Sequence, residues 1–197
     1  MVLGSEAESV PVEADRQGLG FKRVGGMLAC WAGNQCVAEI AVLNSVEGNE
    51  GEDVSGKTVL VLWDAATGKR LKTVEALSAV TLEGSPDGKW IAEGGTDKRI
   101  RFRDSRTLEV VREIRAHDAP VGDLKWHHTL PLLVSSGADQ WIRIWEPETG
   151  RLLEEFRRVD LIPEGLDISA DGRQLGIGNG MTTEIFSPKS FAVASEK

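Results

Sequence analysis

Residues 132–146 read L-L-V-S-S-G-A-D-Q-W-I-R-I-W-E. Two short stretches rich in β-branched and aromatic residues, 132–137 and 141–146, flank the polar turn A-D-Q, and this pattern predicts two adjacent antiparallel strands. A third such stretch, V-G-D-L-K-W, precedes them at 121–126, and a fourth follows within E-T-G-R-L-L-E-E-F at 148–156. The region therefore predicts one unit of four short strands joined by tight turns.

The same frame recurs along the chain. The end of the predicted third strand falls at Trp63, Arg103, Trp145 and Phe186, so the spacings are 40, 42 and 41 residues. A near-constant period of this length is typical of repeat architectures. It predicts about sixteen strands in four units, which cover approximately residues 24–76, 78–115, 121–157 and 163–195.

These repeats resemble the WD-repeat family of β-propellers, and their sequences are similar to those of bacterial members. The resemblance rests on S-P-D-G-K at 85–89, G-A-D at 137–139, W-I-R-I-W-E at 141–146 and L-W-D-A-A-T-G-K at 62–69, and the third unit matches best. It implies an all-β fold, a β-propeller of four-stranded antiparallel blades with about four blades. A ring of seven such repeats would need roughly 290 residues. The 197 residues therefore predict a partial or small propeller, and leave open a homo-oligomer or blades missing from a longer chain.

The resemblance also implies a structural hydrogen-bond set in the third unit, made by His117, Ser135, Asp139 and Trp145. In the second unit the serine and tryptophan positions hold Glu93 and Arg103. We expect these two side chains to form a charge-assisted pair in place of the serine–indole bond. The alternative is that both side chains reach solvent.

One segment matches a nucleotide-binding motif in form. Residues 51–58, G-E-D-V-S-G-K-T, fit the pattern G-x-x-x-x-G-K-[ST]. A phosphate-binding loop must run directly into a helix, whereas the following V-L-V-L-W-D predicts a strand. Nucleotide binding is therefore the alternative hypothesis. The three histidines and two cysteines follow no zinc-ligand spacing, and the sequence contains no coherent set of acid, base, nucleophile or metal ligands. We therefore expect no metal, no cofactor and no catalysis.

The resemblance implies a platform for protein interactions. We expect the partner to bind on the rim formed by blade-entry loops and by the turns between second and third strands. The candidate contact residues on this rim are Glu50, Glu52, Asp53, Lys98, Arg99, Asp118 and Trp141. A net charge of −8 disfavours nucleic acid and anionic membranes, and favours a basic protein partner.

Residues 1–20 contain four acids and no apolar run, so they predict a disordered N-terminal segment rather than a secretory signal. The two cysteines are too few for a disulfide framework, and a cytoplasmic location with reduced thiols is expected. Taken together, the sequence predicts a non-catalytic scaffold or sensor module that binds other proteins. A truncated structural part of a larger WD-repeat regulatory protein is a further alternative.

Overall fold

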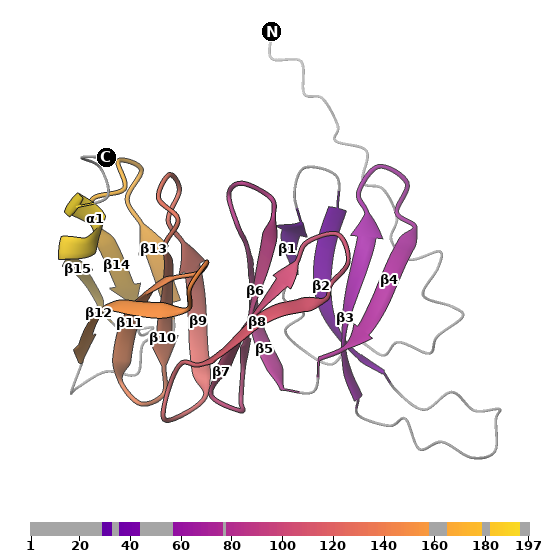
Figure 1. The fold of residues 1–197 in the computed structure, drawn as a ribbon, viewed down its shortest axis with the longest axis horizontal. Coiled ribbons are helices and arrows are strands. Elements are labelled where there is room, and N and C mark those ends of the chain that lie inside the picture. Colours follow the sequence, from indigo (N-terminus) through magenta and orange to yellow (C-terminus); the bar gives the residue numbers. More distant parts are fainter. Residues whose placement is uncertain are drawn as a thin grey trace, which may run out of the picture.

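The computed structural model describes residues 29–32, 36–43, 57–76, 78–157, 165–178 and 182–193, and they form four antiparallel sheets (Figure 1). The first sheet contains β1 (Ala29–Ala32), β2 (Cys36–Leu43), β3 (Lys57–Asp64) and β4 (Arg70–Glu75). The second contains β5 (Ala79–Gly84), β6 (Trp90–Gly95), β7 (Arg99–Asp104) and β8 (Val110–Arg115). The third contains β9 (Val121–Trp126), β10 (Leu133–Gly137), β11 (Trp141–Glu146) and β12 (Arg151–Arg157), and the fourth β13 (Gly165–Ile168), β14 (Leu175–Gly178) and β15 (Thr183–Phe186).

Tight turns give each sheet its up-and-down order, in which consecutive strands are neighbours. In the third sheet, Gln140 adopts a φ of 69° and its N–H donates to the carbonyl of Gly137 over 3.0 Å. The Asp139 carboxylate accepts the N–H of Trp141, which fixes the start of β11. Lys98 and Asp97 repeat this turn in the second sheet, with a φ of 73° at Lys98. An aspartate side chain that bonds the backbone two residues later is a common way to stabilise such a turn.

The second and third sheets each pack apolar side chains on both of their faces. In β10, Leu133 packs towards the second sheet whereas Val134 packs towards the fourth, because successive strand residues point to opposite faces. In β11, Trp145 likewise packs towards the second sheet and Ile144 towards the fourth. The apolar side chains thus form three clusters, one between each pair of sheets that follow each other in the chain.

The first strands of the sheets lie next to one another: β1 contacts β5, β5 contacts β9, and β9 contacts β13. The ammonium group of Lys125 on β9 lies 3.5 Å from both Glu83 on β5 and Asp167 on β13. The carboxylate of Asp123 on β9 accepts the N–H of Leu166 on β13 over 2.8 Å. Polar contacts therefore join these strands directly, and Figure 1 shows the first and fourth sheets at opposite ends of the view.

The expectation of four strands in every unit is wrong for the fourth sheet. Within the described residues this sheet has three strands, and helix α1 (Lys189–Val193) follows β15 where the fourth strand was expected. Pro188 has no N–H for a strand ladder. The N–H groups of Lys189 and Ser190 donate instead to the Glu154 carboxylate on β12, and Phe191 enters the cluster between the third and fourth sheets. The turn of helix is thus held by the preceding sheet.

No helix in the described part of the chain is long and apolar enough to cross a membrane. The N-terminal segment 1–20, for which disorder was predicted, lies outside the described residues.

Candidate functional site

A buried chain of hydrogen bonds runs through the third sheet. The indole N–H of Trp145 donates to Ser135 Oγ over 2.9 Å, and that oxygen lies 2.8 Å from Nε2 of His117. The other ring nitrogen, Nδ1, lies 2.9 Å from the carboxylate of Asp139. The structure thus brings together all four residues of the hydrogen-bond set expected from the sequence. The geometry assigns the imidazole proton to Nδ1, so that Nε2 accepts the serine proton.

The protonation states follow from the surroundings. Burial lowers the pKa of His117, so the imidazole is neutral at pH 7. Burial works against ionisation of Asp139, but the N–H of Asp118 and the guanidinium of Arg143 lower its pKa to about 2. Ser135 is fully buried and both of its hydrogen-bonding directions are used within the chain. The serine hydroxyl therefore links the indole of the third strand to the imidazole before the first strand.

The second sheet fills the same positions with ions. Arg103 Nε donates to Glu93 Oε2 over 2.5 Å, and both residues are buried, with 6% and 1% of their surface exposed. A second guanidinium nitrogen of Arg103 donates to the carbonyl of Leu108 over 2.8 Å. The structure therefore places this pair in contact and away from solvent.

An arginine that pairs with the turn aspartate recurs in the second and third sheets, and the sequence analysis did not predict it. Arg143 pairs with Asp139 at 2.9 Å, and Arg101 pairs with Asp97 in the corresponding place of the second sheet. Each arginine also bonds a glutamate on the fourth strand of its sheet, Glu155 on β12 for Arg143 and Glu113 on β8 for Arg101. The available signal was an aspartate followed four residues later by an arginine, present in both repeats.

The predicted contact rim is only partly described. We use the term entry rim for residues 96–99, 117–118 and 139–141, which are the turns before β7, β9 and β11. Trp141 is half-buried here, and the guanidinium carbon of Arg143 lies 5.4 Å from the centre of its ring.

The charges of the entry rim are largely paired. Arg99 pairs with Glu113, and Asp118, whose side chain is 79% exposed, pairs with Arg115 at 3.4 Å. Lys98 is half-buried in its turn. The acidic candidates Glu50, Glu52 and Asp53 lie outside the described residues.

The geometry argues against a phosphate-binding loop. Lys57 begins β3, whereas the motif requires a helix at that point to present N–H groups to phosphate. Residues 51–56 themselves lie outside the described residues. Within the part that the structure describes, no group of three or more histidine, cysteine, aspartate or glutamate side chains is arranged to hold a metal ion.

Two histidines in the turn between β9 and β10 bond to the backbone of the fourth sheet. His127 is buried; its Nδ1 accepts the N–H groups of Thr129 and Leu130, so the proton sits on Nε2, which donates to the carbonyl of Gly172 over 2.8 Å. His128 Nε2 lies 3.1 Å from the carbonyl of Ile168. Burial lowers the pKa of His127, which keeps this ring neutral.

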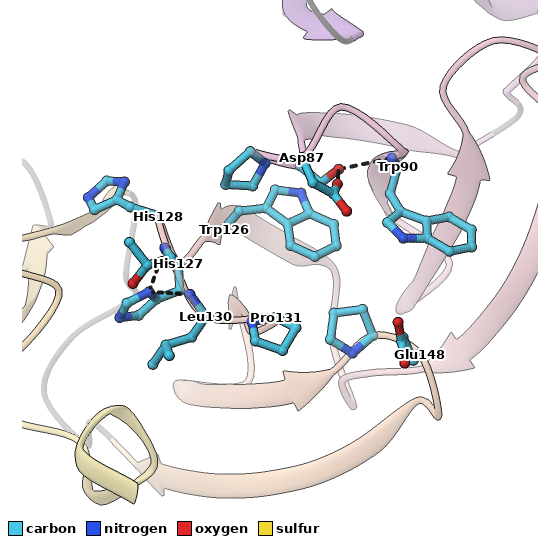
Figure 2. A pocket seen from close by; sticks show the side chains of 12 residues that line it. Asp87, Trp90, Trp126, His127, His128, Leu130, Pro131 and Glu148 are labelled. Carbon is cyan, nitrogen blue, oxygen red and sulfur yellow. Dashed lines mark hydrogen bonds between the residues drawn. The ribbon is translucent and has the colours of Figure 1, made fainter. Parts of the chain in front are cut away.

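A pocket of about 350 Å³ lies between the second and third sheets. It is built from the turn between β5 and β6, the turn between β9 and β10, and the turn between β11 and β12. These turns connect the strand ends opposite to those of the entry rim, so the pocket opens on the other edge. Figure 2 shows the Trp126 indole at its centre, Trp90 beside it, and Asp87 and Glu148 at its margins. We call it the tryptophan pocket.

Proline and tryptophan dominate its walls. Pro86, Pro131 and Pro147 line it together with the two indoles. Trp126 is held in place because its Nε1 donates to the carbonyl of Glu83 over 3.0 Å and its ring meets Phe102 edge-on at 6.2 Å. The sequence motif S-P-D-G-K supplied one wall of this pocket, but pairing it with residues 126–131 required the fold.

Comparison with known proteins identifies the class. Residues 108–146 match the family described as WD domain, G-beta repeat. The matched segment contains His117, Ser135, Asp139 and Trp145. The predicted resemblance is thus confirmed: residues 108–146 match a WD40 repeat, and the chain is distantly homologous to WD-repeat proteins over about half of its length.

The similarity to individual proteins is distant. The chain is 33% identical over 96 residues to the WD repeat-containing protein srw1 of Schizosaccharomyces pombe, which covers 48% of this chain and 17% of that protein. It is 32% identical over 85 residues to the B-type cell cycle switch protein ccs52A of Medicago truncatula, covering 43% and 18%. It is 29% identical over 127 residues to Cell division cycle 20.1, cofactor of APC complex, of Arabidopsis thaliana, covering 59% and 26%. The chain thus spans about a quarter or less of the length of these relatives. The similarity of its repeats to bacterial WD-repeat proteins stays a prediction.

Proposed function

We propose that this chain is a non-catalytic WD-repeat scaffold that binds another protein through its entry rim. WD domains generally mediate protein interactions, and the repeat family of this chain is the first support. We further propose that the four sheets are blades of a partial or small propeller.

The observation that carries the proposal is the position of Trp141. Its indole is half-buried at the start of β11, with Arg143 at 5.4 Å and the charged residues Lys98, Arg99 and Asp118 on the same rim. Tryptophan and arginine are the residues most often found at the energetic centre of protein interfaces. A tryptophan already held by an arginine loses little conformational freedom when a partner covers it.

Substitution of the rim tests the proposal. Proteins captured from a cell extract by the wild-type chain are compared with those captured by Trp141→Ala and by the control Val111→Thr, an exposed site on the outer strand β8. We expect Trp141→Ala to lose at least one partner that wild type and the control both retain. Identical partner sets for all three proteins would contradict binding at this rim.

The preference for a basic partner has a separate test. Charge reversal at Glu50, Glu52 and Asp53 should weaken the association at low salt and have less effect at high salt, because exposed charges are screened. If all three reversals together leave binding at low salt unchanged, the partner is not selected by charge.

A second candidate is that these sheets form part of a larger ring, completed by further blades or by a second copy. The arrangement of the first and fourth sheets at opposite ends of the row favours it (Figure 1). Light scattering of the purified chain separates the two: a dimer indicates completion by a second copy, whereas a stable monomer indicates that the row stands alone.

A further inference from the structure

We propose that the tryptophan pocket is a second binding site, which takes a single arginine side chain from a peptide segment of a partner protein. This site lies on the edge opposite to the entry rim, so the proposal does not depend on binding at that rim.

The charge of the lining selects a cation. The pocket is lined by the carboxylates Asp87 and Glu148 and by no lysine or arginine. Burial opposes ionisation of Asp87, but hydrogen bonds from the Ser85 hydroxyl and the Lys89 N–H lower its pKa, so it is negative at pH 7. Glu148 is exposed and has no ion-pair partner among the described residues. An unpaired carboxylate beside an apolar pocket favours a guest with a positive charge.

The existing partner of Asp87 does not block the site. Lys89 lies 3.3 Å from Asp87, but the two side chains are 72% and 50% exposed. Exposed pairs of this kind contribute little free energy. A guanidinium group of the bound peptide can therefore replace the ammonium of Lys89 beside Asp87 with only a small loss of free energy.

The aromatic surface selects arginine over lysine. Trp90 is partly exposed beside the buried Trp126, so a planar group can stack on an indole face while it reaches a carboxylate at the margin (Figure 2). Guanidinium stacks on tryptophan and binds carboxylates through two parallel N–H groups, whereas ammonium does neither as well. The three prolines stiffen the walls, because each fixes its own φ.

The size of the pocket indicates a peptide. A volume of about 350 Å³ is at the lower end of the range for small-ligand sites. It accommodates one long side chain with its flanking backbone, which is how short linear segments dock on folded domains.

The test follows the indole N–H signals of the intact ¹⁵N-tryptophan-labelled chain by NMR, with the Trp90 signal assigned from Trp90→Phe. The first probe is a pool of heptapeptides with arginine at the centre and mixed uncharged residues around it. The second is the same pool with citrulline, which keeps the shape of arginine and lacks its charge. The third is arginine amide alone.

We expect the arginine pool to shift the Trp90 signal at millimolar concentration, and the citrulline pool to bind about tenfold more weakly or worse. Glu148→Gln and Asp87→Asn, which retain the shapes of the side chains, should each weaken the arginine pool about tenfold. The matched control Glu109→Gln, an exposed glutamate in the corresponding turn of the second sheet outside the pocket, should bind as wild type does. Melting curves of the variants verify that each is folded.

Three results would overturn the proposal: no shift of the Trp90 signal with the arginine pool, equal binding of the citrulline pool, or binding of arginine amide as tight as that of the pool. The last would indicate a site for small guanidinium compounds. Trp141→Ala should leave this binding intact, so loss of the rim function and loss of the pocket function are distinguishable.

Discussion

Arg103 and Glu93 meet at 2.5 Å in the second sheet, at the positions where the third sheet joins Trp145 to Ser135 at 2.9 Å. One repeat thus connects its second and third strands with an ion pair and the next does so with two neutral groups. Both solutions satisfy every buried donor that they introduce, which is the requirement that such a site imposes.

Removing one member of the ion pair should be worse than replacing both. Glu93→Ala leaves the buried Arg103 without its carboxylate, and Arg103→Ala leaves the buried Glu93 with only the more distant Arg101 at 3.7 Å. We expect each single variant to lose about 3–5 kcal/mol in the free energy of unfolding. The double variant Glu93→Ala/Arg103→Ala, which removes both charges, should lose far less than the sum of the two single losses. Urea unfolding of the four proteins measures the coupling, and strictly additive losses would show that the two charges act independently.

At Leu108 we expect the glycine variant to be more stable than the alanine variant, which is the reverse of the usual order. Leu108 has a φ of 57°, at the place in its turn where the first and third sheets have Gly68 and Gly150. Its side chain is nevertheless only 1% exposed, in the cluster between the first and second sheets. Both Leu108→Ala and Leu108→Gly lose that packing, by about 2–4 kcal/mol. Only glycine relieves the left-handed backbone, so the glycine variant should be the more stable of the two by about 0.5–1 kcal/mol.

Leu133 provides the control, because it is equally buried but lies in an ordinary strand. There the glycine variant should be less stable than the alanine variant by about 0.5–1 kcal/mol. The same order at both positions would mean that backbone strain at Leu108 is negligible.

Asp139 predicts a defined loss of stability in acid. Its pKa is about 2 in the folded chain against about 3.9 in an unfolded one, so its carboxylate stabilises the fold above the higher value. That contribution declines as the pH falls from about 4 towards 2. The slope of stability against pH in this interval should be steeper for wild type than for Asp139→Asn, as measured by urea unfolding at each pH. Parallel slopes would assign the acid sensitivity to other groups.

His127 should control the fourth sheet selectively. His127→Ala removes the bond to Gly172 and the edge-on contact with Phe191 at 4.8 Å between ring centres. Hydrogen exchange should become faster in β13, β14 and α1, while β6 and β7 of the second sheet keep their protection. Uniform acceleration across all sheets would contradict a local role.

The period of the sequence predicted much of the fold, since the four repeats correspond to the four sheets, and β9 and β11 begin and end at the residues expected from the turns and apolar stretches. The family prediction is confirmed. The helix α1 could not be predicted from the sequence, because the Glu154 carboxylate that bonds its first residue lies 35 residues away in the chain. The tryptophan pocket escaped for the same reason, since its walls belong to different repeats. The left-handed backbone of Leu108 could not be predicted, because leucine does not favour this conformation and the burial of its side chain is what holds it there.

The row of first strands has a consequence for how the chain tolerates change. Each sheet folds from one continuous segment, and among the described residues the main strand contacts between sheets join sheets that follow each other in the chain, chiefly through β1, β5, β9 and β13. Such an array behaves as a one-dimensional chain of units, in which stability is a sum over units and their junctions. Lys125→Met removes the contacts to Glu83 and to Asp167, so it weakens both junctions of the third sheet and should make the unfolding transition broader or divide it into steps. Duplication or loss of a whole repeat would alter the length of this array and leave the remaining junctions as they are.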